Sequence, residues 1–238
     1  MKKRGVQSLV IANIVILSCV FLLSVAGNKV VSVISENSAA ERRHCIIIDA
    51  GHGGVDGGAS SCTGVLESQI NLEIALRLDD LLHLLGMDTL MTRTTDISIY
   101  TEGESIAAKK VSDLKNRVRI ANENNNGILI SIHQNHFSDN RYSGAQVFYA
   151  KSQGSEVLAR SIQSSLIQTL NPGSKRQAKK ADGVYLMQNV QIPGVLIECG
   201  FLSNPAEEEK LRSASYQKKL CCVISSAIST YIRDDLLA

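Results

Sequence analysis

The sequence has no tryptophan and few other aromatic residues, with four phenylalanines and six tyrosines among 238 residues. A chain so poor in aromatic side chains has little from which to build a base-stacking platform or a sugar-binding aromatic strip. An excess of one charge is also missing, because 25 basic and 23 acidic residues leave a net charge of +2. We therefore expect no nucleic-acid-binding surface.

Several common catalytic and binding motifs are absent as well. The sequence contains no HExxH motif, so the common helical zinc site has no support. The glycine-rich stretch GHGGVDG lacks a Walker lysine, and Asp56 stands where GxGxxG requires its last glycine. Asp49 and Asp56 would also repel an anion. A phosphate-binding loop is therefore not expected here.

The cysteine pattern gives no disulfide framework. There are six cysteines and no CxxC motif, and Cys19 lies within an apolar N-terminal stretch. The other five are an odd number, so most are expected to be buried free thiols. A disulfide between Cys45 and Cys62 remains open.

The N-terminal segment has the layout of an export signal. Three early basic residues precede an apolar stretch from Leu9 to Ala26, which ends in the small residues of SVA. The stretch is also long enough for a membrane anchor, so residues 1–26 are either a cleaved signal peptide or a retained anchor. Both interpretations place the rest of the chain outside the cytoplasm, with membrane contact only through this segment. Residues 27–43 are interpreted as a linker, and residues 44–233 as one catalytic domain.

Hydrophobic patterning in the remaining chain predicts alternating strands and helices. Short apolar runs predict six strands, at residues 44–49, 87–92, 128–132, 145–150, 184–187 and 195–199. Leu66, Ile70, Ile74 and Leu78 recur at helical spacing and predict a first helix, which Gly86 would terminate. Further helices are expected at residues 104–123, 155–170, 205–212 and 214–233. This alternation predicts a single α/β domain with a mostly parallel six-stranded sheet and helices on both faces.

Residues suited to metal binding and proton transfer follow three of these strands. Asp49 and His52 come at the end of the first strand, His133 ends the third and Glu198 ends the sixth. Glu67 opens the first helix. Because sites in open α/β sheets lie beyond the carboxyl ends of the strands, these groups are expected on one rim. Two imidazoles and one carboxylate, with water in the fourth position, are typical of catalytic zinc, and the remaining carboxylate would serve as general base.

Neighbouring residues have secondary or structural interpretations. The glycines beside His52 would let its loop fold tightly and leave room for a metal. Asp49, Asp56 and Asn135 could orient the ligands, or could simply cap turns. His136 is expected at the rim of the site rather than on the metal.

Other reactive side chains are assigned no role in the site. His44 and His83 are interpreted as structural or exposed. Cys199 is expected to face the core, because successive strand residues point to opposite faces and Glu198 faces the site. A solvated surface is the expected role of four basic residues, with contact to an anionic polymer as the alternative: Lys175, Arg176, Lys179 and Lys180.

Several motifs match one family in order. They are IIIDAGHGGVDGGA, MTRTTD, LKNRVRIAN, ILISIHQNHF and VLIECGFLSNPAEEEKL, within residues 44 to about 232. In this order they resemble the zinc-dependent N-acetylmuramoyl-L-alanine amidases. The resemblance implies an α/β sandwich in which His52, Glu67 and His133 bind Zn²⁺ and Glu198 is the catalytic glutamate. It also implies hydrolysis of the amide between the lactyl group of muramic acid and L-alanine of the stem peptide.

Two longer stretches indicate a branch of this family. TEGESIAAKKVSD and SIHQNHFSDNRYSGAQVFY resemble the germination-specific amidases of endospore-forming bacteria. That resemblance implies peptidoglycan of the spore cortex as substrate and a role, beside a separate deacetylase, in forming muramic δ-lactam. Some family members stay inactive until an activator rearranges the site. Since no wall-binding module is visible, an activating or targeting protein is an expected partner.

Two other functions remain open on the residues alone. A non-catalytic peptidoglycan-binding protein could retain this fold, although a binder would have no use for Glu198. A zinc peptidase or deacylase could use the same residues on another amide. The products distinguish them: stem peptides that begin with alanine indicate the amidase, whereas cut peptides or acetate indicate the alternative enzymes.

Overall fold

The structure is a computed structural model that describes residues 44–237. The predicted signal or anchor at residues 1–26 and the predicted linker at residues 27–43 lie outside the described residues. The described part belongs to one compact unit that begins at His44. Within it, no helix combines the length and the apolar character needed to cross a membrane.

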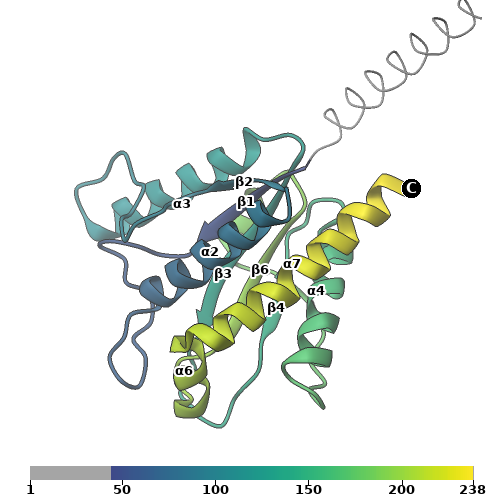
Figure 1. Ribbon diagram of the computed structural model, residues 1–238. Helices are drawn as coiled ribbons and strands as arrows, with labels where there is room; N and C mark the ends of the chain where they lie inside the picture. Colours follow the sequence, from purple (N-terminus) through teal and green to yellow (C-terminus); the bar gives the residue numbers. More distant parts are fainter. Residues whose placement is uncertain (1–43, 238) are drawn as a thin grey trace, which may run out of the picture. The chain divides into compact units, whose positions relative to one another are not determined.

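A single sheet of six strands forms the centre of this unit (Figure 1). The strands are β1 (Cys45–Ala50), β2 (Asp88–Met91), β3 (Gly127–Asn135), β4 (Gln146–Tyr149), β5 (Lys179–Lys180) and β6 (Gly194–Phe201). Their order across the sheet is β2-β1-β3-β6-β4-β5. All pairs are parallel except β4 with β6. The predicted mostly parallel six-stranded sheet is confirmed.

Helices cover both faces of the sheet, as predicted. They are α2 (Glu67–Leu84), α3 (Ile106–Asn122), α4 (Ser155–Thr169), α5 (Tyr185–Asn189), α6 (Pro205–Arg212) and α7 (Ala214–Leu237). The larger core cluster joins α2, α4 and α7 to one face, and the smaller one joins α3 and α5 to the other. In β1, Ile46 and Ile48 belong to the first cluster and Ile47 to the second, which is the alternation expected of a strand buried on both faces.

The helix ends follow the signals in the sequence. Gly86, just after α2, has a φ of 76°, a conformation that glycine adopts at little cost. The Ser105 side chain accepts a hydrogen bond from the amide of Ala108 and caps α3. Asn204 caps α6 in the same way, with Pro205 in the first turn.

One predicted strand is wrong. Residues 184–187 were expected to be extended, but Tyr185–Asn189 form the short helix α5. Leu186 and Met187 are buried in the smaller core cluster. A short apolar run has no periodicity that separates a strand from a buried helical turn, which explains the error. The sixth strand is instead β5, formed by Lys179 and Lys180 at the sheet edge, where no strand was predicted.

The cysteines of the described region are free thiols. Cys45 and Cys62 are not joined, so the disulfide that the sequence left open is absent from this part of the chain. Cys199 is fully buried in the larger core cluster, as expected, and Cys221 is buried beside it.

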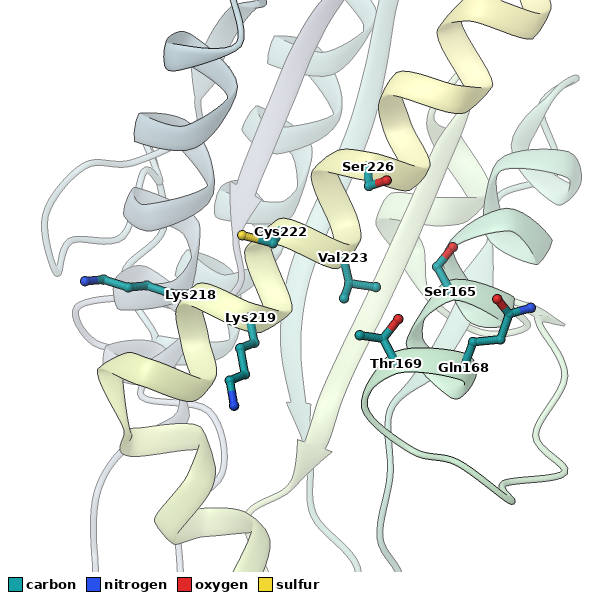
Figure 2. A pocket seen from close by; sticks show the side chains of 8 residues that line it. All are labelled: Ser165, Gln168, Thr169, Lys218, Lys219, Cys222, Val223 and Ser226. Atoms are coloured by element: carbon teal, nitrogen blue, oxygen red, sulfur yellow. The ribbon is translucent and has the colours of Figure 1, made fainter.

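A groove of about 440 Å³ runs between α4 and α7. In Figure 2, Thr169 on α4 and Val223 on α7 point into the gap between the two helices. The lining consists mostly of small polar residues and two lysines, Lys218 and Lys219. None of its eight lining residues is a histidine, aspartate or glutamate, so the groove offers no cluster of metal ligands.

Candidate active site

The carboxyl ends of β1, β3 and β6 present polar side chains on one face of the sheet. On this face the apolar residues Ile47, Leu129 and Leu196 give way two to four residues later to polar groups. Strand alternation places Asp49, Ser131, His133 and Glu198 on the same face. In the register of the sheet, Asp49 pairs with Ser131 and His133 pairs with Glu198. Two neighbouring parallel strands therefore bring an imidazole and a carboxylate side by side.

The glycine-rich loop between β1 and α2 brings His52 over this rim. His52 has a φ of 61°, a left-handed conformation that costs a non-glycine residue about 1–2 kcal/mol. Two glycines make the approach possible. A Cβ on Gly51 would lie 2.2 Å from Nε2 of His133, and one on Gly58 would lie 2.6 Å from Oε2 of Glu67. These glycines give the space in which three polar side chains meet.

His52, Glu67 and His133 form one cluster with the composition of a metal site. Their ligand atoms all lie within 4.8 Å of one another. Oε2 of Glu67 is 3.3 Å from Nε2 of His52, and its Oε1 is 2.9 Å from Nδ1 of His133. The two imidazole rings meet edge to face, with centroids 4.9 Å apart. Two nitrogens and one carboxylate oxygen converging on one point fit Zn²⁺ with an open fourth position.

The Glu67 carboxylate is held in place before any metal is considered. It is 4% exposed and accepts hydrogen bonds from the backbone amides of Ala59 (3.0 Å) and Gln134 (3.1 Å). Asn71, one turn later on α2, donates a third at 3.2 Å. Burial alone would raise the pKa of Glu67, but hydrogen bonds with the two imidazoles bring it well below its usual range. Glu67 is therefore a fixed negative charge at the centre of the cluster.

Asp56 and Lys110 extend the cluster behind His52. Nδ1 of His52 lies 2.9 Å from Oδ2 of Asp56, whose other oxygen is 2.7 Å from Nζ of Lys110. Burial lowers the pKa of His52, but hydrogen bonds with Glu67 and Asp56 outweigh it and raise the value to about 9. The surroundings of this imidazole thus stabilise positive charge, as a cation site requires. The suggestion that Asp56 orients a ligand agrees with this contact.

Glu198 lies beside His133, on the neighbouring strand β6. Burial and the negative charge of Glu67 raise its pKa to about 7, although both imidazoles lower it. Its Oε2 atom is buried and has no hydrogen-bond partner among the described residues. A half-buried carboxylate with a free oxygen and a pKa near neutrality is suited to accept and return a proton.

These groups line a cavity of about 300 Å³. Apolar residues of α3, α5 and β6 form part of its lining. The lining includes Asp49, His52, Asp56, Lys110, Leu114, His133, Val184, Leu186, Leu196 and Glu198.

Other residues singled out in the sequence have different positions. Asp49 accepts hydrogen bonds from Thr92, Ser131 and Arg117, and its contacts with them hold the sheet rim together. Burial would raise its pKa, but Arg117 and Ser131 lower it to about 2. Among the described contacts, the Asn135 side chain is not bonded to either imidazole of the cluster.

The remaining histidines lie outside the cluster. His136 is exposed just beyond β3, consistent with the rim position expected for it. His83 is exposed on α2, where it contacts Asp79 and Thr89. Nδ1 of His44 donates to the backbone carbonyl of Asn126, next to the start of β3.

Lys110 and two buried arginines were not identified in the sequence as parts of the site. Arg93 lies in MTRTTD and Arg117 in LKNRVRIAN, both of which were noted only as motifs. Each matching motif contains an arginine, but many of the partners of these arginines are distant backbone carbonyls, which a sequence pattern cannot specify.

Comparison with known proteins identifies the family of this chain. The sequence model of the N-acetylmuramoyl-L-alanine amidases matches residues 46–230. The chain belongs to this family. The amidase is 41% identical over 191 residues to the germination-specific N-acetylmuramoyl-L-alanine amidase of Bacillus subtilis, which covers 79% of this chain and 80% of the relative.

Solved structures of the family have the same fold as this amidase. The CwlD amidase of Clostridioides difficile, solved in complex with the GerS lipoprotein, matches with a TM-score of 0.77 and 39% identity. That match covers 80% of this chain and 99% of the other. An N-acetylmuramoyl-L-alanine amidase from Clostridium difficile 630 matches with a TM-score of 0.69 and 29% identity, over 81% of this chain and 98% of the other.

The contact of Gly51 with His133 yields a first prediction. A Gly51→Ala substitution should raise the dissociation constant for Zn²⁺ at least about tenfold, because the new methyl group displaces the His133 ring. Titration against a chelating dye measures it. Gly64→Ala is the control, since a Cβ there meets nothing within 4 Å, although its φ of 87° also strains the backbone. Equal zinc affinity in both variants would contradict the role assigned to Gly51.

Proposed function

We propose that this amidase is a zinc enzyme that cleaves stem peptides from spore-cortex peptidoglycan, on the route to muramic δ-lactam. The observation that carries the zinc assignment is the convergence of His52, Glu67 and His133 within 4.8 Å, beside a carboxylate with a free buried oxygen. The cortex assignment is supported by the 41% identity to an amidase named as germination-specific. Residues 44–233 are the proposed catalytic domain.

His52, Glu67 and His133 are the proposed zinc ligands. When bound, Zn²⁺ would supply a water of lowered pKa and would polarise the lactyl carbonyl. Glu67 neutralises part of the ion's charge, and its three hydrogen bonds hold it in place. Asp56 keeps the imidazole of His52 oriented through the contact at Nδ1, which leaves Nε2 facing Glu67.

Glu198 is the proposed general base. The water oxygen forms a bond to the lactyl carbonyl carbon while one water proton passes to the free oxygen of Glu198. The carbon–nitrogen bond then breaks, and Glu198 returns the proton to the departing nitrogen of L-alanine. A pKa of about 7 lets the same carboxyl group act first as base and then as acid near neutral pH.

A proposed partner and location follow from the relatives. A similar amidase was solved together with a lipoprotein, GerS, so we propose that this chain also acts with an extracytoplasmic activating or targeting protein. The proposal agrees with an N-terminal export signal or anchor at residues 1–26, which would place the catalytic domain on the outer side of the membrane.

Product analysis on two kinds of cell wall tests this function. Zinc-loaded protein is incubated with cortex and with vegetative peptidoglycan, beside a Glu198→Gln variant, and the products are identified by mass spectrometry. We expect the wild type alone to release peptides that begin with L-alanine from cortex, leaving muramic acid without a peptide. Release from vegetative peptidoglycan only would contradict the cortex role, and cut peptides or acetate would contradict the amide assignment.

A further inference from the structure

Four consecutive backbone carbonyls accept hydrogen bonds from buried or partly buried side chains. They belong to residues 50–53, the start of the loop that carries His52. A loop that crosses from a strand to a helix ordinarily satisfies its carbonyls with water or with local turns. Here long-range side-chain donors bind all four. The backbone around His52 is therefore fixed from outside the loop.

Arg93 provides the first set of donors. It follows the edge strand β2 and is only 3% exposed. Its Nε donates to the carbonyl of Ala50 at 2.8 Å, and its Nη2 donates to Gly51 at 3.0 Å and to Ser68 at 2.8 Å. Ser68 lies in the first turn of α2, directly after Glu67. One guanidinium thus joins the loop of His52 to the helix turn that carries Glu67.

Arg117 provides the second set from the opposite side. It lies on α3, is 2% exposed, and donates from Nη1 to Ala50 at 2.8 Å and from Nη2 to His52 at 2.7 Å. The same guanidinium pairs with Asp49 and Asp113, both at 2.5 Å. The carbonyl it binds on His52 belongs to the residue with a φ of 61°. This contact therefore acts on the one described non-glycine residue in the left-handed region.

Both guanidiniums are buried beside other charged groups. Burial lowers the pKa of Arg93, and the positive charge of Arg117 lowers it further. Asp49 and Asp113 pair directly with Arg117, while Asp96 lies 3.9 Å from Arg93. Arg93 makes most of its hydrogen bonds to backbone carbonyls, so its guanidinium acts mainly by binding the backbone of the His52 loop.

We propose that Arg93 and Arg117 are positioning residues that hold the His52 loop in its ligand-ready conformation before zinc arrives. The inference rests on the proposed zinc function of His52, Glu67 and His133. It assigns a role to the arginines of MTRTTD and LKNRVRIAN. Among the described contacts, neither guanidinium is hydrogen-bonded to the ligand atoms of the cluster or to Glu198, although Arg117 lines the cavity. Without the two guanidiniums, His52 would relax toward ordinary backbone angles and its ring would leave the cluster.

Lysine substitutions test this role while preserving charge. A lysine ammonium cannot reproduce the planar fork that reaches two carbonyls at once. For Arg93→Lys, and separately for Arg117→Lys, we expect the dissociation constant for Zn²⁺ to rise about 10- to 100-fold. The visible absorption spectrum of Co²⁺ bound in place of zinc should change as well, because the ligand geometry changes. Both measurements use the full-length protein and the metal alone.

Hydrogen exchange on metal-free protein is a readout that does not depend on zinc. The amides of Gly51, Gly53 and Asp56 donate to backbone carbonyls in the wild type. They should exchange faster in each lysine variant, while amides in the sheet interior keep their protection. Ile224→Ala is the matched control, because Ile224 is fully buried on α7 and its truncation destabilises the fold without touching the loop.

The outcomes separate this proposal from the zinc function itself. Zinc affinity and loop exchange that are the same in the lysine variants as in the wild type would overturn the positioning role. The positioning role would also be overturned if Ile224→Ala weakened zinc binding as much as either lysine variant does. The loss of affinity would then come from general instability of the fold. A wild type that binds no zinc would contradict the proposed function, and loop exchange would still decide whether the arginines hold the loop.

Discussion

A Glu198→Gln variant should lose about 10²–10⁴-fold in kcat while binding zinc as tightly as the wild type. Glutamine has the shape of the glutamate but cannot take a proton from water. Glu198 is not within the metal cluster, whose donors are His52, Glu67 and His133. Steady-state release of stem peptides measures the rate, and a dye competition measures zinc binding.

The control for this variant is the same chemical change at a distant site. Glu156 is exposed on α4 and pairs with Arg160, so Glu156→Gln should leave kcat unchanged. A Glu198→Gln variant with more than about a tenth of wild-type activity would contradict the assignment of the base.

The same variant has an expected effect on stability in metal-free protein. The pKa of Glu198 is raised from 4.5 to about 7 in the folded state, so its ionisation opposes folding as pH rises through this interval. Below pH 4.5 Glu198 is neutral in both the folded and the unfolded wild type, so the wild type and the glutamine variant should be equally stable. Above pH 7 the glutamine variant should be the more stable one by urea unfolding.

A Glu67→Gln variant should lose most zinc binding and, with it, the stabilisation that zinc gives. Wild-type protein at free zinc of about 1,000 times Kd should gain about 4 kcal/mol in the free energy of unfolding. The variant should gain close to none, because a neutral amide replaces the charge that contacts both imidazoles. Its NH₂ group would also face the amide of Ala59 or of Gln134, both of which donate to the carboxylate.

Urea unfolding with and without zinc measures this difference. Glu73→Gln, on the same helix, is the matched control: Glu73 accepts a hydrogen bond from Gln217 at 2.9 Å, outside the cluster. It should retain the full zinc-dependent gain in stability. An equal gain in Glu67→Gln would contradict the proposed ligand set.

Much of the rim could be predicted from the sequence because strand geometry is regular. Once β1, β3 and β6 are parallel neighbours, alternation places Asp49, His133 and Glu198 on one face at the same end. The orientation of Cys199 into the core follows from the same rule. The end of the first helix could also be predicted, because Gly86 terminates it through its local backbone preference for positive φ.

Features set by long-range packing could not be predicted in this way. Arg93 and Arg117 bind backbone carbonyls more than 40 residues away, and nothing in the local sequence specifies those partners. Lys110 reaches Asp56 only because α3 packs against the α5 side of the sheet. The helix at residues 185–189 was mistaken for a strand because burial on one face gives short helices and strands the same composition.

Hydrolysis in ¹⁸O-labelled water tests the central claim most directly. The zinc-loaded protein acts on a defined muramoyl peptide, and both products are weighed by mass spectrometry. The account predicts one ¹⁸O atom in the lactyl carboxylate of muramic acid and an unlabelled peptide that begins with L-alanine. Label in a peptide carboxylate or in released acetate would show that a different amide is cleaved, and would contradict the account.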